Sequence, residues 1–79
     1  MKLQIISLKG IQFDGEVSSV NLKTTSGEIT VLDKHRPLIT ELKKGKAVVV
    51  NKSGEKLNFD IKSGFLEIGE NNKATILAN

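Results

Sequence analysis

The sequence predicts an all-β fold, a small antiparallel β-sandwich of about ten short strands that forms one domain over residues 1–79. Nineteen positions carry the β-branched residues that favour strands, 8 Ile, 6 Val and 5 Thr. No segment carries an apolar stripe at the 3.6-residue spacing of a helix. Most of the 7 glycines stand in polar contexts that predict turns, such as 13–15, 26–27 and 52–55.

Two kinds of apolar pattern predict individual strands. Apolar and polar residues alternate at 29–31, 57–61 and 66–68, which is typical of strands that bury one face. Continuous apolar runs at 47–50 and 74–77 indicate strands whose second face is also partly covered. Two such antiparallel sheets, packed face to face, account for the whole chain.

The alternation also predicts core residues. Leu57, Phe59 and Ile61 share one face of their strand and are expected to point inward. The chain has 3 Phe and no Tyr or Trp, so we expect Phe13, Phe59 and Phe65 to serve as core residues. With no exposed aromatic left to stack on bases, nucleic-acid binding is not favoured.

Composition excludes several classes of protein. With Cys at 0 and His at 1, the chain cannot assemble a disulfide framework or the ligand cluster of a zinc site. A net charge of +3, spread along the chain, is only weak evidence for a polyanionic partner. No apolar run approaches the roughly 20 residues that span a bilayer. These features predict a soluble intracellular domain.

Catalytic motifs are not found in the sequence. His35 has no serine in a Gly-x-Ser-x-Gly turn to activate, and no Gly-rich phosphate loop is present. The densest basic run, Lys43-Lys44-Gly45-Lys46, is typical of a solvated face. We therefore expect no enzyme activity, no metal site, no nucleotide-binding site and no cofactor.

The most unusual segment is the charged loop 32–38, which holds the only His, the only Arg and the only Pro of the chain. On composition alone this loop is a solvated connection with a rigid proline turn, although loops of this kind often carry function. The preceding strand, 29–32, places this loop and the turn at 25–28 at its two opposite ends.

The order of the motifs along the chain resembles the epsilon subunit of rotary F-type ATP synthases. The resemblance covers the whole chain and implies a β-sandwich. The segments that carry it are Met1–Ser7, Phe13–Val17, Thr25–Leu32, His35–Leu38, Lys44-Gly45, Gly64–Ile68 and Asn72–Ala78.

The resemblance implies a rotor part that does no chemistry. In that family the sandwich binds the gamma subunit and the c-ring, and so couples proton or ion translocation to ATP synthesis. It lies peripherally on the cytoplasmic side of the plasma membrane, and contacts the membrane only through the complex. We expect the isolated chain to be monomeric. The inhibitory helical hairpin that follows the sandwich in the family, with its nucleotide-binding residues, is expected to be absent from this chain.

The resemblance also implies site residues. Glu28 and the segment His35-Arg36-Pro37 match the end that meets the c-ring, whereas Ser7 and Thr40 match positions that face gamma. An acidic Glu28 could pair with a basic ring loop, and a rigid Pro37 could fix the neighbouring surface.

Two segments depart from the family pattern. The Pro-Gly that commonly precedes the family's histidine reads Asp33-Lys34 here, and the small residue after it reads Arg36, which adds charge to the loop. The usual Ser-Gly-Gly before the Phe-Leu-Glu strand reads Lys62-Ser63-Gly64, so one permissive glycine is lost from this turn.

Two other classes match the size and strand content. Lipoyl- or biotinyl-carrier domains present one modifiable lysine at a hairpin tip, a position that Lys34 could hold, but neither their Met-Lys-Met or Asp-Lys-Ala setting nor their two-fold quasi-repeat is present. A small nucleic-acid-binding β-barrel is the other alternative, and a steep salt dependence of DNA or RNA affinity would identify it.

Overall fold

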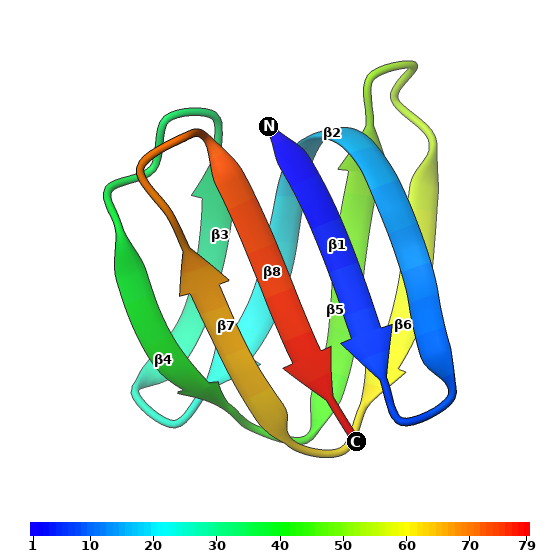
Figure 1. Ribbon diagram of the computed structural model, residues 1–79, viewed down its shortest axis with the longest axis vertical. Coiled ribbons are helices and arrows are strands. Elements are labelled where there is room, and N and C mark those ends of the chain that lie inside the picture. The colour runs from blue at the N-terminus through cyan, green and yellow to red at the C-terminus, as the bar shows by residue number, and fades with distance from the viewer.

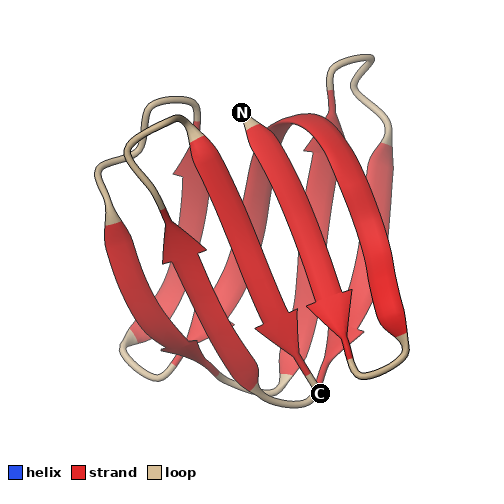
Figure 2. Cartoon of the chain, viewed as in Figure 1, coloured by secondary structure: helices blue, strands red, loops and turns tan.

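The computed structural model describes all residues 1–79 and contains eight strands and no helix (Figures 1 and 2). The all-β prediction is therefore confirmed, with fewer strands than expected. No helix long and apolar enough to cross a membrane is found. The strands are β1 (Lys2–Ser7), β2 (Gly10–Thr24), β3 (Gly27–Leu32), β4 (Leu38–Leu42), β5 (Gly45–Asn51), β6 (Lys56–Ile61), β7 (Gly64–Ile68) and β8 (Lys73–Ala78).

The five segments predicted from their apolar patterns all lie within strands. The alternating segments belong to β3, β6 and β7, and the continuous runs belong to β5 and β8. The lower strand count has one main cause, because β2 runs for 15 residues without a break. The turn predicted at 13–15 is wrong, since Gly15 lies inside β2 and has no positive φ that would require a turn.

Strand β2 connects the two layers of the sandwich. Its first half pairs with β1, and its second half pairs with β3 and β5. The pairing with β5 is irregular between Val17 and Ser19, where the strand passes from one layer to the other. The front layer in Figure 1 contains β4, β7, β8, β1 and the first half of β2, and the back layer contains β3, the second half of β2, β5 and β6.

The sandwich is not wholly antiparallel, which corrects the sequence prediction. Strands β1 and β8 lie side by side and run parallel, from the pair Lys2 with Lys73 to the pair Ile6 with Leu77. A parallel pair needs a long connection between its strands, and here that connection is the rest of the domain. On the far side of the front layer, the single pair Thr24 with Leu42 links β2 to β4.

Fifteen buried apolar residues fill the space between the layers. Ile61 is among them, and Leu57 and Phe59 pack against them, so the predicted inward face of β6 is confirmed. Phe13 also packs against the core, but Phe65 is 53% exposed and its assignment to the core is wrong. The 15 residues are Met1, Leu3, Ile5, Val17, Val20, Leu22, Val31, Leu42, Ala47, Val49, Ile61, Leu66, Ile68, Ala74 and Ile76.

Candidate protein docking surfaces

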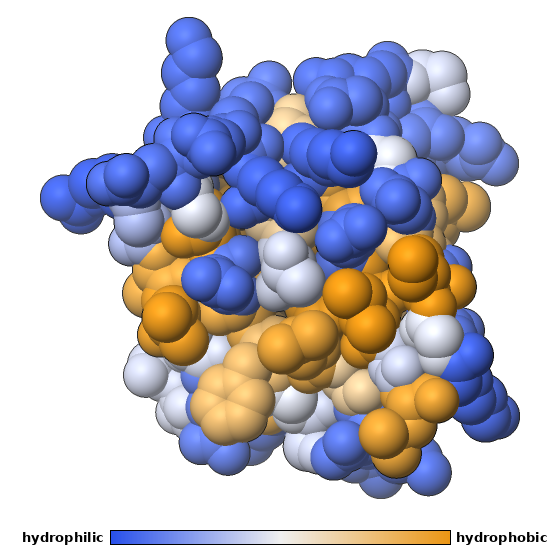
Figure 3. Space-filling view, viewed as in Figure 1, coloured by the Kyte–Doolittle hydropathy of each residue, from blue (hydrophilic) through white to orange (hydrophobic).

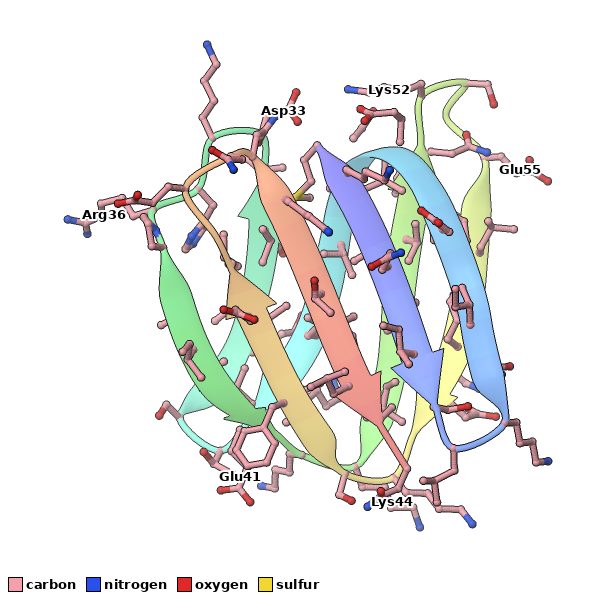
Figure 4. All side chains as sticks on the ribbon, viewed as in Figure 1. Asp33, Arg36, Glu41, Lys44, Lys52 and Glu55 are labelled. Carbon is pink, nitrogen blue, oxygen red and sulfur yellow. The ribbon has the colours of Figure 1, made fainter.

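The connections between strands gather at the two ends of the sandwich. We call one of them the Glu28 end, which is formed by the turns 8–9, 25–26, 43–44 and 62–63. The opposite end, which we call the Asp33 end, is formed by Met1, the loop 33–37 and the turns 52–55 and 69–72. Figure 4 shows Asp33, Arg36, Lys52 and Glu55 at the upper end, and Glu41 and Lys44 at the lower one.

The structure does not bring together the residues predicted to meet the c-ring. Glu28 lies at the start of β3, and His35, Arg36 and Pro37 follow the end of the same strand. An extended strand of this length spans roughly 20 Å. Glu28 and the segment 35–37 are therefore at opposite ends of the molecule, and one flat partner surface cannot contact both.

Glu28 is held by its neighbours in the back layer. Its carboxylate accepts a hydrogen bond of 3.0 Å from Asn21 Nδ2 and lies 3.5 Å from Lys23 Nζ. Lys23 is also its cross-strand partner in the β2–β3 ladder. The hydrogen bond from Asn21, followed by the charge of Lys23, lowers the pKa of Glu28. The acid is thus ionised and already paired within the domain.

The loop at the Asp33 end is fixed by contacts with several segments. Asp33 accepts a hydrogen bond from the Met1 ammonium, and Lys52 Nζ lies 3.5 Å from it. The backbone N–H of Lys34, which has a φ of 62°, donates to Asn72 Oδ1 over 2.6 Å. His35 Nδ1 lies 2.8 Å from the carbonyl oxygen of Arg36. These contacts place His35 and Arg36 at a polar pocket of about 280 Å³, which is also lined by Lys34, Pro37, Glu70 and Asn72.

Ser7 and Thr40, which were predicted to face gamma, both lie in the front layer but apart from each other. Ser7 Oγ accepts hydrogen bonds of 3.1 Å from the backbone N–H of Lys9 and from Gln12 Nε2, so it organises the β1–β2 turn. Thr40 is half-buried in β4, opposite Leu66. Strands β8 and β7 lie between β1 and β4, which separates the two residues by roughly 14 Å.

A band of exposed apolar residues crosses the outward face of the front layer (Figure 3). Ile11 pairs with Ile6, Ile6 with Leu77, and Leu77 with Phe65, so four strands contribute to one lateral row. Ile11, Leu77 and Phe65 are each more than half exposed, and Ile39 on β4 is 72% exposed. We call these five residues the apolar band.

Sequence reasoning missed the apolar band although the sequence carries a signal for it. Four strands of the front layer contain two consecutive apolar residues, Ile5-Ile6, Leu38-Ile39, Phe65-Leu66 and Ile76-Leu77. Because side chains alternate between faces, one residue of each pair must point outward. The outward face of the back layer is mostly polar by comparison. It carries Asn21, Lys23, Glu28, Thr30, Lys46, Asn58 and Asp60.

The arrangement offers surfaces for binding. No three His, Cys, Asp or Glu side chains come together to hold a metal ion.

Residues 1–79 match the family described as the ATP synthase, Delta/Epsilon chain, beta-sandwich domain. The chain belongs to this family. The membership sets aside the carrier-domain and nucleic-acid-barrel alternatives, because the match covers the whole sandwich.

The relatives of this delta/epsilon domain are ATP synthase epsilon chains. The chain is 43% identical over 68 residues to the ATP synthase epsilon chain of Xanthomonas campestris pv. campestris. The aligned region covers 86% of this chain and 49% of the relative. It is 39% identical over 79 residues to the ATP synthase epsilon chain of Stenotrophomonas maltophilia, which covers 100% of this chain and 56% of the relative. The chain thus spans about half the length of the curated relatives it matches.

Solved structures share the fold of the delta/epsilon domain. A chain of the Euglena gracilis mitochondrial ATP synthase, in a structure of OSCP/F1/c-ring, superposes with a TM-score of 0.90 at 23% identity, over 96% of this chain and 48% of that one. A chain of the Tetrahymena thermophila mitochondrial ATP synthase central stalk/c-ring gives a TM-score of 0.79 at 20% identity, over 99% of this chain and 62% of that one.

Proposed function

We propose that the chain is a non-catalytic rotor component of an ATP synthase, which binds the gamma subunit and the c-ring and so couples ion translocation to ATP synthesis. Family membership and the epsilon-chain relatives support this proposal. The observation that carries it is the apolar band, because it marks one face of the domain for burial against a partner. The function requires no cofactor and no nucleic acid.

We assign the apolar band to the gamma subunit. The row Ile11, Ile6, Leu77 and Phe65 is continuous across four strands, and Phe65 supplies an aromatic anchor between Leu77 on β8 and the neighbouring strand β4. Aromatic residues, Phe included, are enriched at protein interfaces, where a few well-packed side chains carry most of the binding energy. The positions that the resemblance assigned to gamma are chain neighbours of this band, since Ser7 follows Ile6 and Thr40 follows Ile39.

We assign the Glu28 end to the c-ring. The gamma-facing band lies along the side of the sandwich, which leaves either end free for a second partner. Choosing the Glu28 end removes His35, Arg36 and Pro37 from the ring contact, because they lie at the opposite end. The domain is then peripheral, on the cytoplasmic side of the plasma membrane, and reaches the membrane only through the complex.

Binding to isolated gamma subunit tests the proposal. Phe65→Lys places a charge within the apolar band, at its aromatic residue, and should weaken binding about 30-fold or more. Asn58→Lys introduces the same charge on the outward face of the back layer, where Asn58 is exposed, and should leave binding unchanged. Both positions are exposed, so both variants should fold, which circular dichroism and thermal melting check.

Two results would contradict the proposal in different ways. Failure of the unsubstituted chain to bind gamma would remove the proposed function itself. Equal binding by Phe65→Lys and Asn58→Lys would keep the function but show that gamma does not occupy the apolar band.

A further inference from the structure

The net charge of the chain is concentrated at one end of the fold. The whole chain carries +3, and the half of the sandwich nearest the Glu28 end accounts for all of it. Six lysines lie in this half, Lys9, Lys23, Lys43, Lys44, Lys46 and Lys62. Only three carboxylates accompany them, Glu28, Glu41 and Asp60. The half nearest the Asp33 end has six basic and six acidic residues and is neutral.

Two of these lysines are already paired with carboxylates of the domain. Lys23 lies 3.5 Å from Glu28, and Lys46 lies 2.7 Å from Asp60. The other four take part in no ion pair, are exposed, and come from three different turns at the same end. These four are Lys9, Lys43, Lys44 and Lys62, and we call them the lysine cluster.

The free charge at the Glu28 end is therefore positive, although Glu28 was predicted to pair with a basic loop. The carboxylate of Glu28 is occupied by Asn21 and Lys23. We propose that this end recognises an acidic surface, namely carboxylates on the polar loops of the c-ring, through the lysine cluster. This inference rests on the proposed function, because it specifies the chemistry of the ring contact assigned above.

A cleft beside the lysine cluster favours a protein, rather than a small ion, as the partner of this end. It has a volume of about 370 Å³ and lies between the β1–β2 turn and the end of β6, with Ile5 and Ile61 among its lining residues. Lys9 and Lys62 also line it, and Leu8 at the tip of the turn is 93% exposed. An acidic loop with one apolar side chain could fill the cleft while its carboxylates meet the two lysines.

The distribution of charge favours protein loops over a lipid surface. Glu28, Glu41 and Asp60 lie among the lysines, and a uniformly anionic membrane would repel all three. A protein surface can instead place its carboxylates opposite the lysine cluster and avoid these acids.

The test measures binding of the chain to purified c-ring in detergent over a series of salt concentrations. Neutralising Lys9, Lys44 and Lys62 together to Gln should weaken binding roughly tenfold at low salt and flatten its salt dependence. The matched control neutralises Lys2, Lys56 and Lys73, which are exposed, take part in no ion pair and lie in the neutral half. This control should bind within about twofold of the unsubstituted chain.

The variant Glu28→Lys distinguishes an acidic partner surface from a basic one. An acidic ring surface predicts unchanged or tighter binding, whereas a clear loss would show a basic partner and overturn the inference. Salt-independent binding would overturn it as well. Equally tight binding to anionic phosphatidylglycerol vesicles without the ring, with the same lysine dependence, would show that lipid is the partner and also overturn it. No binding of the unsubstituted chain to the ring would instead count against the proposed function.

Discussion

Phe13 and Phe59 pack edge to face, with ring centroids 5.7 Å apart and ring planes at 67°. Phe13 lies on the first half of β2 in the front layer, and Phe59 lies on β6 in the back layer. No ladder joins these two strands, whereas the opposite side of the sandwich is linked by the backbone pair Thr24 with Leu42. Side-chain packing therefore closes this side of the domain.

Replacing Phe59 by Ala should lower the free energy of unfolding by about 2 to 4 kcal/mol, because it removes this ring contact and leaves a gap beside the core. The control Phe65→Ala removes the same side chain from an exposed site and should change stability by no more than about 0.5 kcal/mol. Urea unfolding of both variants measures the difference. Equal losses would mean that the inward faces of β6 and β7 are assigned incorrectly.

Gly64 should be intolerant of any side chain. Its φ is +150°, and an added Cβ would lie 2.0 Å from the carbonyl oxygen of Leu77 in the neighbouring strand β8. In the segment Lys62-Ser63-Gly64, which stands where the resemblance expects Ser-Gly-Gly, the retained Gly64 is the position whose backbone requires glycine, because Ser63 has no positive φ. We expect Gly64→Ala to cost about 2 to 4 kcal/mol of unfolding free energy.

Gly15→Ala is the matched control for Gly64. Gly15 has no positive φ, and its added Cβ would make only ordinary contact with Phe13, at 3.5 Å. Its cost should stay below about 1 kcal/mol, and thermal melts of the two variants make the comparison. If Gly64→Ala and Gly15→Ala have the same melting temperature, β7 and β8 are not as close as the structure shows.

Acid should destabilise the domain partly through Asp33. The hydrogen bond from the Met1 ammonium is the main cause that lowers the pKa of Asp33, with the charge of Lys52 acting in the same direction against desolvation. Because the folded-state pKa lies below the unfolded value, this carboxylate stabilises the fold above about pH 4. The contribution is lost as pH falls through the folded value.

The variant Asp33→Asn tests this linkage. Denaturant unfolding measured between about pH 5 and pH 2 should show a shallower decline of stability with falling pH than the unsubstituted chain shows. Lys56→Gln, at an exposed position that takes part in no ion pair, should keep the original slope. Identical slopes for Asp33→Asn and the unsubstituted chain would show that Asp33 is not linked to folding.

The isolated chain should hydrolyse no ATP and bind no zinc. The one histidine contacts the backbone of Arg36, and no cluster of metal-ligating side chains accompanies it. A phosphate-release assay and titration with Zn²⁺, followed by thermal melting, check both expectations. Turnover by a preparation free of the catalytic subunits, or a metal-dependent rise in melting temperature that His35→Ala abolishes, would contradict this prediction.

The local sequence determined that the chain is all-β and which face of an alternating strand is apolar. Alternation in 57–61 predicted that Leu57, Phe59 and Ile61 share an inward face, and the structure confirms it. This succeeds because the period of two is a property of the strand itself and needs no knowledge of its neighbours. The motif order likewise identified the family.

Only the tertiary structure decided which strands lie side by side and which face of each is covered. Phe65 and Leu66 are both apolar, and only the packing of β7 against the back layer turns Leu66 inward and leaves Phe65 exposed. Gly15 was compatible with a turn, but pairing with β1 keeps it within one long strand. Glu28 and His35 are near in sequence, yet the extended strand between them carries them to opposite ends. Pairing and layering depend on contacts between distant segments, and a local pattern encodes the faces of a strand without specifying its partners.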